Sequence, residues 1–390
     1  MFYRQYNTSY ETHTRVIAGI DCIGHLGDEI RGQKASKILL VSDPHISETS
    51  FYKKCLNHVK ESGVEFLTYN DVEEEAPLRI VEIVRSVILE NKCDLLIAVG
   101  GGSVIDTCKG AGVLATNGGL AKNWAGYEKY SIPPVPLFTI PTTAGTSSEV
   151  TSMAIIHDED THVKFTIGHK ELGCAKVAFL DSGSLSSCPR SVIALSGIDA
   201  LSHAFESFIA LKANPITEAL SLQSIRLISR NLRLVHGNSD NAAAALDLLI
   251  GSTMAGLAFT TTGCGNAHCI GRHVGPKFNV NHGMSIALVL PAVARFNFNV
   301  QMEKYRCIAE AMDLDVRNVP LASIGVIVAD AIQQLINDVG IKQTMQDMNP
   351  SKADFEEIAK DGLAAYKAHY NMKNPSKMSI GDFMHILEDC

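Results

Sequence analysis

The stretch Asp94-Leu-Leu-Ile-Ala-Val-Gly-Gly-Gly-Ser-Val-Ile-Asp106 decides the fold of this 390-residue chain. Its first half is an unbroken apolar run, typical of a strand buried on both faces of a parallel sheet. Glycines follow, and then residues that fit the start of a helix. Because glycine permits close approach and a helix N-terminus offers free N–H groups to anions, Gly101, Gly102 and Ser103 are candidate pyrophosphate contacts. The alternative is a plain glycine-rich turn, since the spacing is neither Gly-x-Gly-x-x-Gly nor a Walker loop.

Similar apolar runs lie on both sides of this stretch, at 37–41, 137–140 and 177–180. Segments with helical periodicity lie at 47–63 and 78–91. This alternation predicts an α/β, Rossmann-like dinucleotide-binding domain with a parallel sheet. After Asp181 the pattern changes to long segments of helical period, at 213–231, 242–259, 285–296 and 323–339. We therefore expect an α/β domain over 1–185 and an all-helical domain over 186–390.

Two other strand ends carry polar residues suited to a nucleotide. Pro141-Thr-Thr-Ala-Gly-Thr-Ser-Ser-Glu149 follows the strand at 137–140, where parallel sheets bind ligands, although a turn and helix cap would have the same composition. Asp43 follows the strand at 37–41. A carboxylate there accepts hydrogen bonds from a ribose 2′-hydroxyl and repels a 2′-phosphate, which favours NAD over NADP.

A second kind of site is indicated in the helical half. Asp199, His203 and Glu206 stand at i, i+4 and i+7 of an otherwise apolar segment and share one helix face. An aspartate and a histidine one turn apart can hold a divalent cation, and the alternative is a buried ion pair or hydrogen-bonded pair. Glu206, one turn further on, is better suited to supporting the ligands or to a structural role.

Further histidines follow at His268 and His282, on either side of a segment that contains Pro276. We expect this segment to be a loop from which both rings reach one point. One oxygen and three nitrogen donors suit Fe(II) or Zn(II) and not a calcium site. Cys264 and Cys269 flank His268 and are weaker metal candidates, because cysteine is more often a small buried hydrophobe.

The composition favours small molecules as partners. The chain has 34 basic and 42 acidic residues, a net charge of -8, and no long charged run, so nothing indicates binding to nucleic acid or to an anionic membrane. No stretch approaches the roughly 20 consecutive apolar residues of a membrane span, and the N-terminus lacks the apolar core of a signal peptide. The ten cysteines form no Cys-x-x-Cys pair, which fits reduced thiols. We expect a cytoplasmic protein.

These motifs, in this order, resemble the iron-containing alcohol dehydrogenase family over nearly the whole chain. The resemblance implies an N-terminal NAD(H)-binding domain, a C-terminal helical metal and substrate domain, and hydride transfer between nicotinamide and a small alcohol or aldehyde. It also leads us to expect a homo-oligomer, a dimer or larger, with the tyrosine-rich N-terminal segment as a candidate interface. By position, the metal ligands would be Asp199, His203, His268 and His282. The cofactor residues would be Asp43, Gly101, Gly102, Ser103, Thr142, Thr143, Ser147 and Lys164.

The chain departs from the family pattern at Arg272, where a second histidine usually stands and takes part in proton transfer. A guanidinium is a poor acid or base but a good clamp for carboxylate, sulfonate or phosphonate. With His273 and Lys277 nearby, Arg272 favours an aldehyde with an anionic tail, such as a sulfoacetaldehyde-, phosphonoacetaldehyde- or semialdehyde-like substrate. Arg272 would otherwise face the cofactor phosphates or solvent. Proton exchange would pass through water, the ribose hydroxyls or His273.

Other functions fit the same motifs. A hydroxyacid-oxoacid transhydrogenase would keep NAD bound while two substrates exchange hydride, and a lactaldehyde or 1,3-propanediol type of reductase would take neutral substrates. A metal-binding structural or regulatory protein of this fold would show no turnover. The sister branch of glycerol dehydrogenases and dehydroquinate synthase lacks the Asp-x-x-x-His pair seen at Asp199 and His203.

Overall fold

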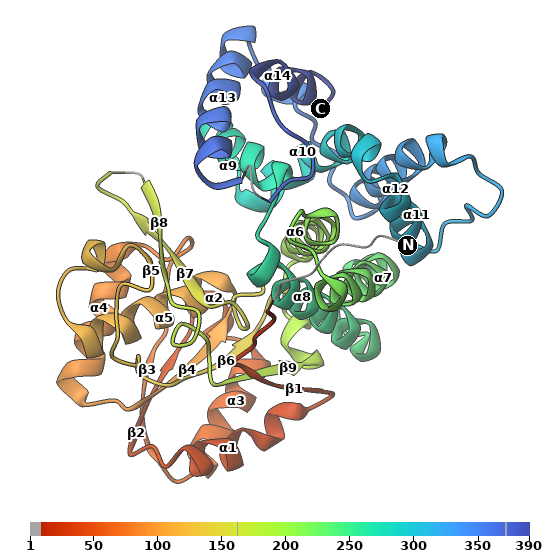
Figure 1. Ribbon diagram of the computed structural model, residues 1–390. Coiled ribbons are helices and arrows are strands. Elements are labelled where there is room, and N and C mark those ends of the chain that lie inside the picture. Colours follow the sequence, from red (N-terminus) through yellow and green to blue (C-terminus); the bar gives the residue numbers. More distant parts are fainter. Residues whose placement is uncertain (1–8, 162, 371–372) are drawn as a thin grey trace. The chain divides into compact units, whose positions relative to one another are not determined.

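The computed structural model describes residues 9–161, 163–370 and 373–390. The chain forms two compact units (Figure 1). The first, the α/β unit, comprises Thr12–Cys188 and Ser239–Leu249. The second, the helical unit, comprises Pro189–Asn238 and Ile250–Cys390, and residues 9–11 group with it. The expectations about a signal peptide and a tyrosine-rich interface concern residues 1–8, which lie outside the described residues.

The α/β unit is built on a six-stranded sheet in the order β1-β9-β6-β4-β2-β3, and each neighbouring pair is parallel. The predicted parallel sheet and its four predicted strands are confirmed. The sequence pattern missed the two edge strands, because an edge strand is only partly buried and lacks a continuous apolar run. The strands are β1 (Arg15–Gly19), β2 (Lys37–Val41), β3 (Glu65–Tyr69), β4 (Leu95–Gly100), β6 (Leu137–Pro141) and β9 (Val177–Asp181).

Helices cover both faces of this sheet, and β4 shows why its sequence is apolar throughout. Leu95, Ile97 and Val99 belong to one buried cluster, with side chains of α1 (Leu26–Gln33) and α3 (Ser50–Glu61). Leu96 and Ala98 belong to another cluster, with side chains of α4 (Leu78–Asn91) and α5 (Gly102–Asn117). Successive side chains of a strand point to opposite faces, so a strand covered on both sides has no polar position. The short α2 (Pro44–Ser47) follows β2.

A smaller sheet of three strands, in the order β5-β8-β7, completes the α/β unit. Its strands are β5 (Gly126–Tyr127), β7 (Met153–Asp158) and β8 (Val163–Gly168). β7 and β8 pair as an antiparallel hairpin. This hairpin carries Lys164.

The helical unit contains no strand among the residues that the structure describes, as predicted. Three helical segments, Arg190–Ile209, Ala242–Thr262 and His282–Val300, are long and apolar enough to cross a membrane by length and composition. Within the protein, 83%, 61% and 67% of their apolar windows are buried, so these segments form its interior. The helices are α6 (Arg190–Ile209), α7 (Pro215–Gly237), α8 (Ala242–Thr262), α9 (Asn266–Phe278), α10 (His282–Asn297), α11 (Met302–Ala311), α12 (Ile324–Asp338), α13 (Lys352–Ala365) and α14 (Ile380–Glu388). The first part of α8, up to Leu249, belongs to the α/β unit.

Candidate metal and cofactor sites

Helix α6 carries the first part of the candidate metal centre. Asp199, His203 and Glu206 lie on one face of the helix and are 4%, 6% and 2% exposed. Buried polar side chains are costly unless they are paired or bind a ligand. The interactions of these three side chains therefore indicate whether this face of the helix is a structural cluster or a ligand site.

Helices α9 and α10 bring the remaining histidines to this face. His268 lies in the first turn of α9, and His282 is the first residue of α10. The expectation that Pro276 lies in a loop between them was wrong, because Pro276 is inside α9. A proline in the last turn of a helix removes only one hydrogen bond, and the helix ends two residues later, before Asn279 in the left-handed conformation. The connection is thus only residues 279–281.

The four predicted ligands converge. Asp199 Oδ1 lies 3.4 Å from Nε2 of His268, 3.5 Å from Nε2 of His282 and 3.9 Å from Nε2 of His203. Donor atoms about 2.1 Å from a tetrahedral metal ion stand about 3.4 Å apart. Within the described chain, Asp199 Oδ1 and His268 Nε2 are also buried without a hydrogen-bond partner, as is the other ring nitrogen of His203, Nδ1. Buried donor atoms that lack partners and have this spacing fit a divalent cation.

Glu206 fixes the orientation of His268. One carboxylate oxygen, Oε2, lies 2.7 Å from His268 Nδ1 and accepts the N–H of Gly265 at 2.9 Å. The other, Oε1, accepts the N–H of Ala267 at 2.5 Å. Because Nδ1 faces the carboxylate, Nε2 is the ring nitrogen whose lone pair is directed at Asp199. Glu206 therefore supports the histidine, as its place on the helix face predicted, and fastens α6 to the start of α9.

The electrostatics of the cluster favour a positive charge inside it. Burial opposes ionisation of Asp199, but His203 and His282 hold the pKa of its carboxyl below the usual range. Burial lowers the pKa of His203 to about 4, so its ring is neutral near pH 7. Burial also acts against protonation of His268, and Cys264, Asp199 and Glu206 together raise its pKa above the usual value. Buried carboxylates attract a proton, as the raised pKa of His268 indicates, or a metal cation in its place.

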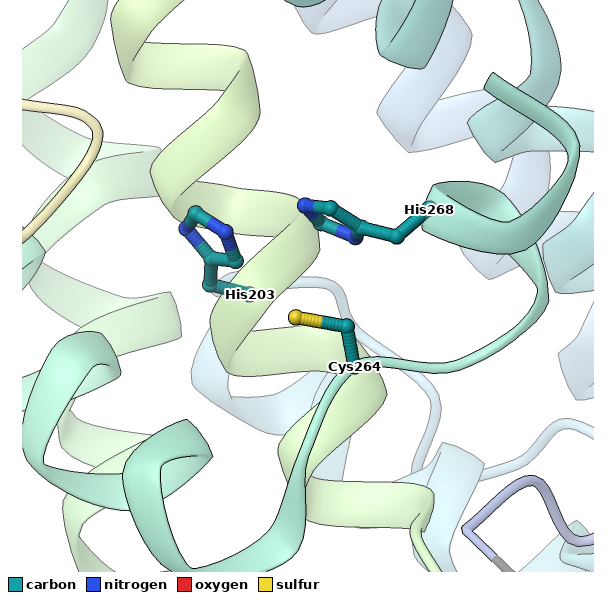
Figure 2. Close-up of side chains that lie close together, drawn as sticks. All are labelled: His203, Cys264 and His268. Atoms are coloured by element: carbon teal, nitrogen blue, oxygen red, sulfur yellow. The ribbon is translucent and has the colours of Figure 1, made fainter. Parts of the chain in front are cut away.

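Cys264, the weaker candidate in the sequence, also lies at this cluster. Its sulfur and a ring nitrogen of each of His203 and His268 all lie within 4.8 Å of one another. Figure 2 shows the two imidazole rings directed toward each other and the thiol pointing into the space beside them. The ring centroids of His203 and His268 are 4.5 Å apart. The other flanking cysteine, Cys269, is turned away and donates to the carbonyl of Gly362 at 3.5 Å.

Except for Lys164, which lies on β8 of the smaller sheet, the candidate cofactor residues lie at the carboxyl ends of three neighbouring parallel strands, β6, β4 and β2, and in the loops that follow them. The loops after β4 and β6 are joined by a hydrogen bond of 3.1 Å from Thr142 N to Gly100 O. A Cβ atom on Gly101 would stand 3.3 Å from the Thr143 side chain, and one on Gly102 would stand 2.8 Å from that of Thr146. Only glycine leaves this space open. Open backbone at the N-terminus of α5 fits a pyrophosphate.

Two charged side chains on α5, the buried Lys109 and the partly buried Asp106, hold the loop after β6 in place. Lys109 Nζ donates to the carbonyls of Ser148 at 2.6 Å, Thr151 at 2.7 Å and Met153 at 3.0 Å. Asp106 accepts from the Ser148 hydroxyl and from the N–H of Ile155 at 2.9 Å. This role was not predicted from the sequence, although two charges on an otherwise apolar helix indicate buried polar partners.

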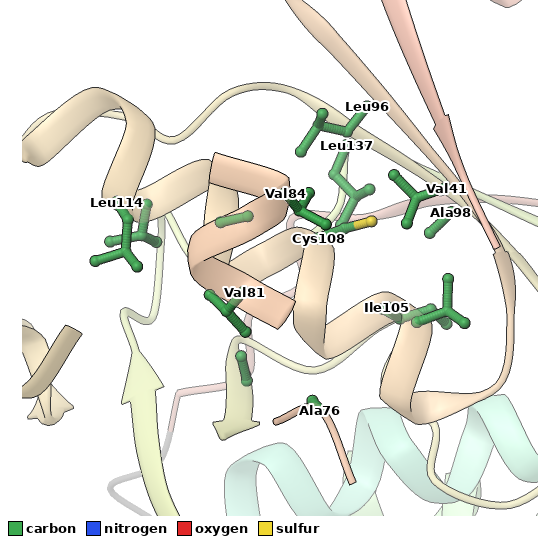
Figure 3. Close-up of a cluster of buried hydrophobic side chains, with 14 of the residues drawn as sticks. Val41, Ala76, Val81, Val84, Leu96, Ala98, Ile105, Cys108, Leu114 and Leu137 are labelled. Atoms are coloured by element: carbon green, nitrogen blue, oxygen red, sulfur yellow. The ribbon is translucent and has the colours of Figure 1, made fainter. Parts of the chain in front are cut away.

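Helix α5 is itself fixed to the sheet. It contributes Ile105, Cys108 and Leu114 to a buried cluster that includes Leu96 of β4 and Leu137 of β6 (Figure 3). The helix therefore positions the loop from a rigid base.

Asp43 and Lys164 are held close to their own structural partners. Asp43 Oδ1 caps α2 by accepting the N–H of Ile46 at 2.9 Å. Lys164 Nζ lies 2.6 Å from Glu75 Oε1, and the N–H of Glu75 donates to Ser103 Oγ at 2.9 Å. The structure thus connects Lys164 to the glycine loop through Glu75, a residue that the sequence analysis did not single out. Ser147 is buried and has a left-handed backbone, with φ of 55°.

Comparison with known proteins adds to this geometry. Residues 13–182 match the family model described as iron-containing alcohol dehydrogenase, and residues 193–390 match the C-terminal model of the Fe-containing alcohol dehydrogenase family. The chain belongs to the iron-containing alcohol dehydrogenase family. The resemblance seen in the motifs and the two-part fold are confirmed. This alcohol dehydrogenase is an oxidoreductase that acts on CH–OH groups.

Individual relatives of this alcohol dehydrogenase align along nearly its whole length. It is 32% identical over 366 residues to 1,3-propanediol dehydrogenase of Citrobacter freundii, covering 93% of this chain and 94% of the relative. It is 29% identical to sulfoacetaldehyde reductase of Bilophila wadsworthia, over 96% and 97% of the two chains. A crystal structure of 1,3-propanediol oxidoreductase superposes with a TM-score of 0.93 at 31% identity, over 98% and 99% of the chains.

Arg272 of this alcohol dehydrogenase is exposed on α9, one turn after His268. With His273 and Lys277 it lines an open depression of about 380 Å³ whose other walls are Pro276, Glu357, Ile358 and Asp361. The ammonium group of Lys277 pairs with Glu357 at 2.7 Å and Asp354 at 2.9 Å. Lys277 is thereby neutralised, unlike the expectation that it would add to a positive substrate site.

Proposed function

We propose that this alcohol dehydrogenase uses NAD(H) and one divalent metal, Fe(II) or Zn(II), to interconvert a small alcohol and its aldehyde, and that the substrate has an anionic tail. The observation that carries the proposal is the convergence of Asp199, His203, His268 and His282, in which Asp199 Oδ1 and His268 Nε2 are buried without a hydrogen-bond partner in the described part of the chain. Alcohol and aldehyde chemistry is supported by the activities named for the similar proteins, 1,3-propanediol dehydrogenase and sulfoacetaldehyde reductase, and an anionic tail is supported by the second of these names alone.

In this proposal the protein's own groups bind and orient. Asp199, His203, His268 and His282 hold the metal, which when bound supplies Lewis-acid polarisation of the substrate oxygen. Glu206 keeps the ring of His268 in position. The nicotinamide cofactor would supply the hydride chemistry. Its proposed contacts are Gly101, Gly102 and Ser103 at the pyrophosphate, Asp43 at the ribose, and Thr142, Thr143, Ser147 and Lys164 along the loops.

An anionic substrate tail is supported by cations around Arg272. Burial lowers the pKa of Lys373, and the positive charges of Lys212 and Arg272 lower it further against the opposing effect of Cys264. A Cβ atom on Gly263, the residue before Cys264, would stand 3.0 Å from Lys373 Nζ. A guanidinium with a nearby ammonium binds carboxylate, sulfonate or phosphonate groups well.

His273 is the protein group proposed for proton exchange, since Arg272 cannot serve. Burial lowers the pKa of His273, and the nearby Arg272 lowers it further against the opposing effect of Asp361. The ring is therefore neutral near pH 7 and can accept a proton. The test is the pH profile of kcat for His273→Ala. Loss of an ionisation from the acidic limb is expected, whereas an unchanged profile would assign proton exchange to water or to the ribose hydroxyls.

We also propose that the cofactor domain spans 1–185 and the metal and substrate domain 186–390. We expect a cytoplasmic homo-oligomer, a dimer or larger, whose mass can be measured by light scattering.

The proposed activity is tested by anaerobic NADH oxidation with metal-loaded protein. Small neutral aldehydes are compared with aldehydes that carry carboxylate, sulfonate or phosphonate, for the wild type, Arg272→Ala and Arg272→His. We expect the arginine variants to raise KM for the charged aldehydes at least about tenfold, as for loss of one charge-assisted hydrogen bond, and to leave neutral aldehydes unchanged. Equal wild-type activity on both sets would remove the role of Arg272 and favour a reductase of neutral substrates.

The same assay separates the remaining functions. A transhydrogenase would exchange hydride between two substrates but would not oxidise free NADH continuously with one aldehyde. No turnover with any aldehyde or alcohol, despite bound metal and NADH, would contradict the enzymatic proposal.

A further inference from the structure

Cys264 gives the candidate metal centre a donor beyond the Asp199 and three-histidine set. Sulfur is a soft donor, whereas carboxylate oxygen is hard, so a thiol at this position bears on which metal is held. The sulfur and ring nitrogens of His203 and His268 lie within 4.8 Å of one another. Donor atoms of Asp199, His268 and His282 satisfy the same condition, and His268 is common to both sets.

The two imidazoles next to the thiol are buried, and within the described residues each has a ring nitrogen without a hydrogen-bond partner. His203 and His268 are 6% and 5% exposed. His203 Nδ1 and His268 Nε2 have no hydrogen-bond partner in the described part of the chain. His203 also stacks on Phe259, with ring centroids 4.3 Å apart, which fixes the plane of its ring. The thiol therefore lies beside two buried, oriented nitrogen donors.

The backbone around Cys264 holds the sulfur in a defined place. Gly263, which has a φ of 73°, lets the chain turn sharply after α8. The N–H of Gly265 is bound by Glu206 at 2.9 Å, and the same carboxylate oxygen lies 2.7 Å from His268 Nδ1. One buried carboxylate thus positions both the histidine and the residue that follows the thiol.

We propose that Cys264 Sγ is a metal donor in this protein, which together with His203 and His268 forms a second donor set overlapping the first. The site then favours thiophilic divalent cations, with zinc and cobalt held more strongly than manganese. This inference rests on the metal centre of the proposed function.

The test is cobalt(II) substitution of the full-length protein, read by absorption spectroscopy. A thiolate bound to cobalt gives a charge-transfer band in the near ultraviolet that oxygen and nitrogen ligands do not give. We expect this band in the wild type, its loss in Cys264→Ser and Cys264→Ala, and its retention in Cys269→Ser. Cys269 is the matched control because it lies one residue beyond His268 and is directed at a backbone carbonyl instead.

Metal affinities give a second readout that does not depend on the band. Competition with a chromophoric chelator should show that Cys264→Ser weakens zinc binding at least about tenfold and manganese binding much less. Circular dichroism of each variant establishes that it is folded. Cobalt bound without a thiolate band, or a band that survives in both Cys264 variants, would overturn the role of Cys264 alone. A wild-type protein that binds no cobalt would contradict the metal centre and this inference with it.

Discussion

Replacing Glu206 with glutamine tests the metal centre without replacing any residue that is proposed as a ligand. The carboxylate accepts hydrogen bonds from three N–H groups, those of Gly265, Ala267 and the His268 ring. A glutamine amide of the same shape has one accepting oxygen, and its NH2 group must face at least one of these donors. The substitution therefore removes at least one hydrogen bond to a charged acceptor, worth about 1.5–3 kcal/mol.

Because 1.4 kcal/mol corresponds to a factor of ten, Glu206→Gln should weaken metal binding by roughly 10- to 100-fold. The assay is zinc competition with a chromophoric chelator, together with circular dichroism of the metal-free protein. Glu218→Gln is the control, because Glu218 lies in the same helical unit and is paired with Lys304 at 2.7 Å instead. A zinc Kd for Glu206→Gln within twofold of the wild type would refute the idea that this carboxylate prepares His268 for the metal.

The remaining predictions concern the candidate cofactor site and the helix beneath it. Asp43→Asn keeps a good helix cap but removes the charge, so the ratio of kcat/KM for NADPH to that for NADH should rise at least about tenfold, with the free energy of unfolding nearly unchanged. An unchanged ratio would show that Asp43 does not select the cofactor. Gly102→Ala places a methyl group 2.8 Å from the Thr146 side chain, and should weaken NADH binding roughly 10- to 100-fold by fluorescence titration; wild-type affinity would contradict a cofactor at this turn. Lys109→Met leaves three carbonyls and Asp106 without their cation, and should destabilise the protein by about 3–5 kcal/mol and lower Tm by roughly 10 °C in a thermal melt. A Tm equal to that of the wild type would show that the buried ammonium is dispensable.

The fold was largely predictable because its central strands and long helices have strong periodic patterns. The run at Leu95–Gly100 is apolar at every position, since both faces of β4 are covered. The edge strand β3 was missed, because its residues are half exposed and resemble a loop. The position of Pro276 was mispredicted for a related reason, since proline is tolerated in the last turn of a helix but usually marks its end.

The candidate site was predictable where residues of one chemistry lie at helical spacing, as at Asp199 and His203. It was less predictable where distant segments meet. Nothing local to Glu75 indicates that it joins Lys164 to the glycine loop, because that link depends on how the β7–β8 hairpin folds back. The pairing of Lys277 with Asp354 and Glu357 likewise depends on the packing of α13 against α9. The sequence around a charged residue does not indicate whether its charge is paired within the fold or is available to bind a ligand.

The hydrogen bonds from Lys109 to the loop after β6 affect which substitutions this enzyme tolerates. The ammonium group binds the main-chain carbonyls of Ser148, Thr151 and Met153, groups that every amino acid possesses. The course of the main chain at these three residues therefore does not depend on which side chains the loop carries. Substitution of a partly exposed side chain of the loop, such as Thr143, can change cofactor preference with little loss of stability, whereas Lys109 itself admits almost no substitute.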